Sequence, residues 1–249
     1  MKLVPFIVIF FFLSLSGFAH GQRLNLELDH KKLIFQGTIE RDFLKQLNTF
    51  LVQKYYEAVR SGSVVRKTKL QRLQNQRMLN PIIARILAYE ALEEEKRDLA
   101  LEILKYIVQL DIQMIIIDSQ GGILQEIIPL NIIVEELDLR VHVPSKGICA
   151  SACSFFFHHS SKRTMGEEAE LMYHKNELII PYGWGLWRVC ETSHDSNSFC
   201  SRSPSMITVL REYEEFLASL PGPIFQAVEA GEDRYVKRSE AKLLGILTE

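Results

Sequence analysis

The most informative part of this chain is D-S-Q-G-G at residues 118–122, followed by K-G-I-C-A-S-A-C-S at 146–154 and E-L-M-Y-H at 170–174. The first of these follows Ile112–Ile117, a short, β-branched and nearly all-apolar segment of the kind that forms a buried strand. A double glycine, a serine among small residues and a histidine therefore stand at the ends of successive expected elements. Serine acyl-transfer sites are built from these residue types.

The rest of the chain alternates between strand-like and helix-like segments. The expected strands are Leu33–Phe35, Ile112–Ile117, Arg140–Val143 and Leu171–Tyr173, and the expected helices between them are Ile123–Leu137 and Ala150–Phe157. This β-α-β-α-β order predicts an α/β fold in which a parallel sheet is layered with helices. Residues 54–108 read as an all-helical insertion, in which Pro81 is expected to open a new helix; residues 175–204 are expected to be irregular and 246–248 to form a final strand.

Composition sets broad limits on function. The chain has 249 residues, of which 47% are hydrophobic and 24% charged, and its formal net charge is -2. These are ordinary values for one or two globular domains with a sizeable core. Because no global excess of basic residues is present, a nucleic-acid partner is not expected.

The N-terminus has the pattern of a secretory signal peptide. Lys2 precedes an uncharged apolar run at residues 3–18, and small residues follow it. Cleavage is expected after Ala19 or Gly21, and an uncleaved membrane anchor is the alternative. The expected organisation is a signal peptide at 1–21 and one α/β domain at 22–249 that carries the helical insertion at about 54–108, in a periplasmic or secreted protein.

The four cysteines favour disulfide bonds in an exported chain. Cys190 and Cys200 bracket a polar loop, and their pairing is the first prediction. Cys149 and Cys153 flank Ser151 and either pair with each other or remain buried thiols. Helical i, i+4 geometry is poor for a disulfide, which weighs against that second bridge. No metal site is expected, because histidines at usable spacing are lacking.

The residues around Ser151 suggest its chemistry. The preceding strand ends near Pro144, so Ser151 is expected at the start of a helix, where free N–H groups favour negative charge. The N–H groups of Gly122 and Ala152 are the candidates for an oxyanion hole. His174, at the end of its strand, is the candidate base. A third group is then needed to orient the imidazole.

At this point a family resemblance becomes specific. The ordered motifs S-Q-G-G, G-I-C-A-S-A and L-M-Y-H, with the tail D-R-Y-V-K-R-S-E-A-K-L-L-G-I-L at residues 233–247, resemble the Clp proteolytic-subunit family of serine peptidases within the crotonase-like superfamily. The C-A-S-A-C motif behind a signal peptide is similar to an exported bacterial branch of that family. The resemblance covers about residues 32–53 and 109–249.

The resemblance implies roles for the site residues. Ser151 would be the nucleophile, His174 the general base and Asp233 the acid that orients it, with Gly122 and Ala152 in the oxyanion hole. The implied reaction is hydrolysis of a peptide or protein substrate through an acyl-enzyme, without a cofactor. A homo-oligomer is left open, and an ATPase partner is not expected outside the cytoplasm, where ATP is scarce.

The chain departs from the family pattern at several points, and two other functions and one rival mechanism remain open. Gln120 replaces the usual proline, the helical insertion is extra, and His174 and Asp233 are 59 positions apart (233 minus 174). The main alternative is a catalytically inactive binding or scaffold protein of the cell envelope. Acyl transfer on an ester or thioester, and a Ser–Lys dyad that uses Lys175, rank lower.

Overall fold

A five-stranded sheet forms the centre of the computed structural model, which describes residues 24–63, 69–89, 92–175, 178–182, 186–190 and 204–248. The strand order is β1 (Asn25–Asp29), β2 (Lys32–Gln36), β3 (Met114–Asp118), β4 (Arg140–Val143) and β6 (Lys162–Met165). The strands from β2 to β6 run parallel, and β1 pairs with β2 as an antiparallel hairpin. Parallel strands place their carboxyl ends at one edge, so the segments that follow β2 and β3 lie close together.

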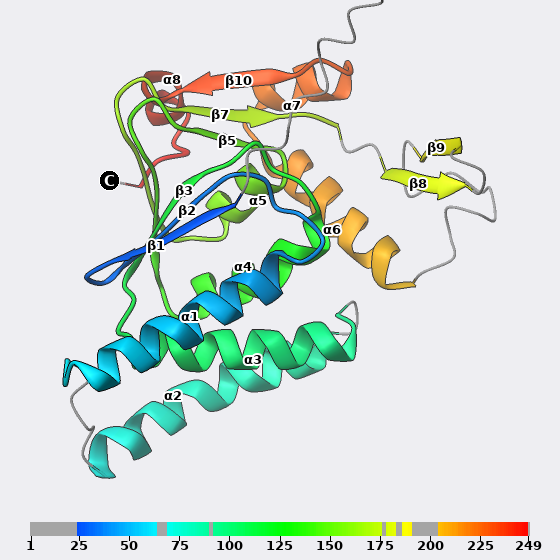
Figure 1. Ribbon diagram of the computed structural model, residues 1–249. Coiled ribbons are helices and arrows are strands. Elements are labelled where there is room, and N and C mark those ends of the chain that lie inside the picture. The colour runs from blue at the N-terminus through cyan, green and yellow to red at the C-terminus, as the bar shows by residue number, and fades with distance from the viewer. Residues whose placement is uncertain are drawn as a thin grey trace, which may run out of the picture.

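A second sheet of three strands continues from that edge. Its order is β10 (Arg234–Lys237), β7 (Glu170–Tyr173) and β5 (Ile148–Ala150), with β5 parallel and β10 antiparallel to β7. A single bridge between Ser119 and Cys149 joins it to the segment after β3. Figure 1 shows this sheet at the opposite end of the molecule from the helical insertion. The three segments that carry the site motifs are therefore neighbours.

Helices cover the sheets. They are α1 (Phe43–Arg60), α2 (Lys69–Ala88), α3 (Glu94–Gln109), α4 (Leu124–Glu136), α5 (Ala152–His158), α6 (Pro204–Ser219), α7 (Gly222–Glu229) and α8 (Arg238–Leu243). In α1 the buried side chains Phe43, Leu44, Leu47 and Leu51 recur at helical spacing and form the face that packs on the core. Figure 1 shows α1 and α3 below the five-stranded sheet, with α2 outermost.

A buried ion pair fixes the helical insertion to this core. Lys96 of α3 lies 2.9 Å from Glu126 of α4, whose other carboxylate oxygen accepts the N–H of Leu44 at 3.3 Å. Only 2% of Glu126 is exposed. Burial of a carboxylate without partners would destabilise the fold. The Lys96 ammonium and the Leu44 N–H both offset this cost at Glu126.

The expected fold class, a parallel sheet layered with helices plus a helical insertion, is confirmed. Two details within the helices differ from expectation. Pro81 lies inside α2 instead of opening a helix. The buried side chains of Ile82 and Ile86 continue the apolar face past the proline, and their burial outweighs one lost backbone hydrogen bond. The expected helix from Ala150 begins at Ala152 instead, because residues 148–150 pair with β7.

The C-terminal third also differs from expectation. Within residues 175–204, β8 (Leu178–Tyr182) and β9 (Leu186–Cys190) pair as an antiparallel hairpin. Both segments are rich in β-branched and aromatic residues, which favour strands. The expected last strand at 246–248 is absent, although Thr248 donates its N–H to Arg163 at 3.2 Å. Within the described ranges, no helix is long and apolar enough to cross a membrane.

Candidate active site

Ser151 occupies a sharp turn between β5 and α5. Its φ is 54°, a left-handed conformation that side-chain-bearing residues rarely adopt. The turn is held from both sides. Ser151 donates its N–H to Met172 of β7 at 3.0 Å, and its carbonyl accepts the hydroxyl of Ser154 at 2.7 Å. A strained backbone that neighbouring elements hold in place is characteristic of functional sites.

The double glycine lies directly against this turn. Gly121 and Gly122 have φ values of +88° and +140°. A β-carbon on Gly121 would lie 2.4 Å from the carbonyl oxygen of Ala150 and 2.7 Å from the β-carbon of Ser151. A β-carbon on Gly122 would lie 2.2 Å from the carbonyl oxygen of Ile39. Both positions therefore need glycine, for the close approach as well as for the backbone conformation.

Hydrogen bonds fix the glycine segment to β5. Ser119 donates its N–H to Ile148 at 2.7 Å and accepts that of Ala150 at 2.9 Å. The side chain of Asp118 accepts the N–H of Ile148 at 2.9 Å. In addition, the Ser119 hydroxyl accepts the N–H of Gly121 at 3.1 Å. The S-Q-G-G segment is thus held in one position beside Ser151.

The two N–H groups predicted for an oxyanion hole are unused by the backbone. Among the described residues, neither Gly122 nor Ala152 donates its N–H to a backbone carbonyl. The neighbours of Gly122 are engaged with Ile39: the carbonyl of Gly121 accepts from it, and the N–H of Ile123 donates to it, both at 2.8 Å. The backbone around Gly122 is thereby fixed, while its own N–H meets no backbone acceptor in the described part of the chain, as an oxyanion donor requires.

His174 lies beside this turn. It follows β7, the strand that pairs with β5, and it is partly buried. Its Nδ1 lies 2.7 Å from the carbonyl oxygen of Lys175. A carbonyl only accepts hydrogen bonds, so Nδ1 is the donor, and in the neutral imidazole the lone pair is then on Nε2. The imidazole is therefore held in the tautomer that a general base requires.

Asp233 comes to the same place through strand pairing. Arg234 of β10 is the register partner of Tyr173 in the antiparallel β10–β7 pair, so the next position along places Asp233 opposite His174. The Asp233 side chain is exposed. Within the described residues, the side chains of Ser151, His174 and Asp233 form no hydrogen bond with one another. Catalytic hydrogen bonds often tighten only when substrate is bound.

A disulfide bond brackets the serine. Cys149 and Cys153 are bonded to each other, and both are fully buried. Their α-carbons are 5.1 Å apart, within the usual range for a disulfide. The objection from helical spacing does not apply, because Cys149 lies on β5 and only Cys153 lies on α5. The expected pairing of Cys190 with Cys200 lies outside the described residues.

We expect breakage of this bridge to loosen the serine turn. Replacing both Cys149 and Cys153 by alanine should lower the free energy of unfolding by about 2 kcal/mol, since the bond closes only a short loop. Modification of Ser151 by a serine-reactive probe should also slow, because the bond joins the two elements that set its position. Urea unfolding and probe-labelling rates, with and without a dithiol reductant, measure both effects. An unchanged labelling rate in the reduced wild-type protein would contradict the second expectation.

A partly buried histidine lies behind the site. The Nε2 of His158 on α5 is 2.9 Å from the hydroxyl of Tyr173 on β7, and the rings of Phe157 and Phe216 pack against the imidazole. Burial lowers the pKa of His158 to about 3, and the nearby Arg163 guanidinium also lowers it. His158 is therefore neutral at physiological pH, which suits a structural role.

The lowered pKa of His158 makes the stability of the fold depend on pH. The unfolded chain binds a proton at His158 near pH 6.5, whereas the folded chain does so only near pH 3. The free energy of unfolding should therefore fall as the pH drops below about 6.5, by at most about 1.4 kcal/mol per pH unit from this group. Urea unfolding at pH 7 and pH 5 tests this, with His158→Gln as the comparison. An equal change in the free energy of unfolding between pH 7 and pH 5 in the wild type and in His158→Gln would show that His158 does not cause the pH dependence.

Tyr213 on α6 is a site residue that the sequence did not reveal. It is 1% exposed, and its hydroxyl donates to the carbonyl oxygen of His174 at 3.1 Å. Burial raises the pKa of the Tyr213 phenol, and an interaction with the Ser151 side chain partly offsets that rise. The segment around it reads only as an amphipathic helix, and no local motif marks a contact between residues 39 positions apart.

Comparisons with known proteins give little further information. No family model matches the chain, and no curated protein matches it. Among solved structures, the chain is similar to a mutant of the 1510-N membrane-bound stomatin-specific protease, with 15% identity and a TM-score of 0.38, over 60% of this chain and 70% of that one. This likeness is too loose to bear on function. In the described part of the chain, no group of three or more metal-ligating side chains gathers.

Proposed function

We propose that this chain is an exported serine-type peptidase that hydrolyses peptide bonds through an acyl-enzyme. The observation that carries the proposal is the Ser151 turn. It has a positive φ, packs against the glycine turn, and follows β5, which pairs with the strand β7 that precedes His174. A core serine that only filled space would need neither the backbone strain nor two glycines.

The geometry suggests how the reaction proceeds. Nε2 of His174 takes the proton of the Ser151 hydroxyl as the oxygen attacks the scissile carbonyl. The N–H groups of Gly122 and Ala152 then stabilise the negative oxygen of the tetrahedral intermediate. His174 returns the proton to the leaving amine, and water hydrolyses the acyl-enzyme by the reverse sequence. Asp233 stabilises the charged imidazole from the neighbouring strand.

The disulfide at Ser151 supports export. Buried disulfides persist in oxidising compartments and are rare in the cytosol. The signal peptide proposed for residues 1–21 lies outside the described residues. With it, the protein would act in the periplasm or be secreted, on peptide or protein substrates and without an ATPase partner. The resemblance to Clp proteolytic subunits supports the same reaction, and leaves assembly into a homo-oligomer as part of the proposal.

One observation favours the alternative of an inactive binding or scaffold protein. The Nδ1 of His174 is bonded to the carbonyl of Lys175, and Asp233 is exposed. A carbonyl can hold the imidazole in place, but it stabilises the charged form less than a carboxylate does. If this arrangement persisted with substrate bound, the serine would be only weakly activated.

Labelling by a fluorophosphonate probe separates the two functions. The oxidised protein without residues 1–21 should be labelled on Ser151, and both Ser151→Ala and His174→Ala should abolish labelling. The controls are Ser61→Ala and His30→Ala, which change exposed residues far along the chain from the site and should label like the wild type. A folded, oxidised wild-type protein that resists labelling would favour the scaffold alternative.

A further inference from the structure

Tyr213 links the two halves of the candidate site from a third element. Its hydroxyl donates to the main-chain oxygen of His174, and it also interacts with the side chain of Ser151. These two residues belong to different strand ends, and α6 lies beside both. A single buried hydroxyl is thus in a position to set where the nucleophile and the base stand relative to each other.

Aromatic packing holds α6 against the helix that begins after Ser151. The ring of Phe155 on α5 lies 5.6 Å from that of Tyr213 and 5.2 Å from that of Phe216, centre to centre. The His158 ring is 5.0 Å from the Phe216 ring. Such offset and edge contacts favour one arrangement of the two helices. Movement of α6 would therefore move the Tyr213 hydroxyl relative to the site.

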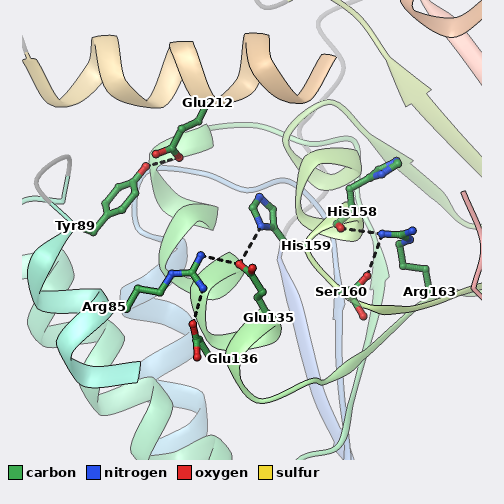
Figure 2. Close-up of polar contacts among 9 residues, drawn as sticks. All are labelled: Arg85, Tyr89, Glu135, Glu136, His158, His159, Ser160, Arg163 and Glu212. Carbon is green, nitrogen blue, oxygen red and sulfur yellow. Dashed lines mark hydrogen bonds and ion pairs between the residues drawn. The ribbon is translucent and has the colours of Figure 1, made fainter. Parts of the chain in front are cut away.

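Glu212, which precedes Tyr213 on α6, is hydrogen-bonded to a residue of the helical insertion. Tyr89, directly after α2, donates its hydroxyl to Glu212 at 2.5 Å, across 123 positions of sequence. Figure 2 shows this contact between α6 and the end of α2. Both side chains are partly buried, so the hydrogen bond is shielded from competing water.

The end of α2 is itself anchored to the core. Arg85 lies 2.8 Å from Glu135 and 2.6 Å from Glu136, both at the end of α4, and Figure 2 shows the guanidinium between the two carboxylates. The segment of the insertion that carries Tyr89 is therefore held to α4.

A cleft of about 560 Å³ lies among the helices that carry these contacts. Its walls come from α2, α4, α5 and α6, and include Tyr89, Asn131, His159, Glu212 and Phe216. Besides its contacts with α4 and α7, α6 is held beside this cleft by the aromatic contacts with α5 and by the Tyr89–Glu212 hydrogen bond.

We propose that Tyr213 is a positioning residue for Ser151 and His174, and that the helical insertion keeps it in place through the Tyr89–Glu212 contact. This inference rests on the proposed peptidase function and gives the insertion a role in that same site. Tyr213 does not touch the reacting bond. It acts by fixing the carbonyl of His174 and the side chain of Ser151.

Conservative variants test each link. Tyr213→Phe removes only the hydroxyl and should lower kcat, and the rate of fluorophosphonate labelling, by about tenfold, the loss of one buried hydrogen bond, while KM stays within about twofold. Tyr89→Phe should lower the same rates by about threefold. Tyr56→Phe, which changes an exposed tyrosine, is the matched control.

The Glu212 variants separate positioning from general stability. Glu212→Gln keeps an acceptor for the Tyr89 hydroxyl and should retain the wild-type rate, whereas Glu212→Leu should match Tyr89→Phe. The double variant Tyr89→Phe/Glu212→Leu should be no slower than either single variant, because both remove one interaction. Wild-type rates in Tyr213→Phe, or additive losses in the double variant, would overturn the proposal.

Hydrogen exchange keeps the test valid if the protein proves inactive. Tyr213→Phe and Tyr89→Phe should both speed amide exchange in the peptide that contains His174, and Tyr56→Phe should not. An unlabelled wild type that shows these changes would refute the peptidase function and retain the positioning role. Unchanged exchange in both variants would refute the positioning role itself.

Discussion

Replacing Ser151 by alanine should lower kcat for a quenched fluorescent, denatured protein substrate by about 10⁴-fold or more, without unfolding the chain. The variant loses the proposed nucleophile but keeps the S-Q-G-G segment and the N–H groups of Gly122 and Ala152. Residual catalysis from such groups is small compared with that of the intact site. Initial-rate kinetics on purified wild-type and variant proteins, with thermal unfolding as the check on folding, measure the effect.

The other two proposed catalytic residues sharpen this prediction. His174→Ala should lose about as much activity as Ser151→Ala, and the double variant no more than either, because the two act as a unit. Asp233→Asn should lose less, since the carbonyl of Lys175 already holds the tautomer of His174. Additive losses in the double variant would show that Ser151 and His174 do not cooperate. Activity that persists in Ser151→Ala would point to a contaminating peptidase, and loss of activity in the exposed control Ser61→Ala would point to an effect unrelated to the site.

Replacing Gly121 by alanine should abolish labelling of Ser151 and destabilise the fold strongly. The new β-carbon would lie 2.4 Å from the carbonyl oxygen of Ala150 and 2.7 Å from the β-carbon of Ser151, so the serine turn must move. The positive φ adds backbone strain of about 1–3 kcal/mol, and the clash adds to it. Urea unfolding and fluorophosphonate labelling measure the two losses separately.

Gly231 offers a matched control for this variant. Its φ of +82° is close to the +88° of Gly121, but a β-carbon there would meet nothing within 4 Å. Gly231→Ala should therefore show the backbone strain alone, with labelling retained. The difference between the two variants in the free energy of unfolding isolates the cost of the contact that a β-carbon at residue 121 makes with Ser151 and Ala150. Equal effects of the two substitutions would mean that Gly121 does not pack against the serine as described.

The local order of the chain could be predicted from the sequence because it depends on short-range patterns. The apolar run before Asp118 indicates a buried strand, and β3 ends at that residue. The glycines at 121 and 122 indicate a turn that needs unusual backbone angles, and both have positive φ. Element boundaries were less predictable. Ala150 reads as the start of a helix, yet residues 148–150 pair with β7, since a partner strand overrides weak local preference.

The arrangement across the site depends on contacts that no local pattern encodes. The register of β10 against β7 places Asp233 opposite His174, although 59 positions of sequence separate them (233 minus 174). The Cys149–Cys153 bond depends on a strand-to-helix turn at Ser151, which spacing alone could not distinguish from helical geometry. Tyr213 reaches the site through the packing of α6, which includes its aromatic contacts with α5.

The residues proposed to carry the chemistry could therefore be predicted from the sequence: a serine, a histidine, an aspartate and two glycines at the ends of predictable elements. How they lie relative to one another depends on the folded chain, because strand register, disulfide geometry and helix packing are set by contacts between distant segments. The role of the helical insertion belongs to the second group. Its Tyr89 contacts Glu212 across 123 positions, and only the folded chain brings the two together.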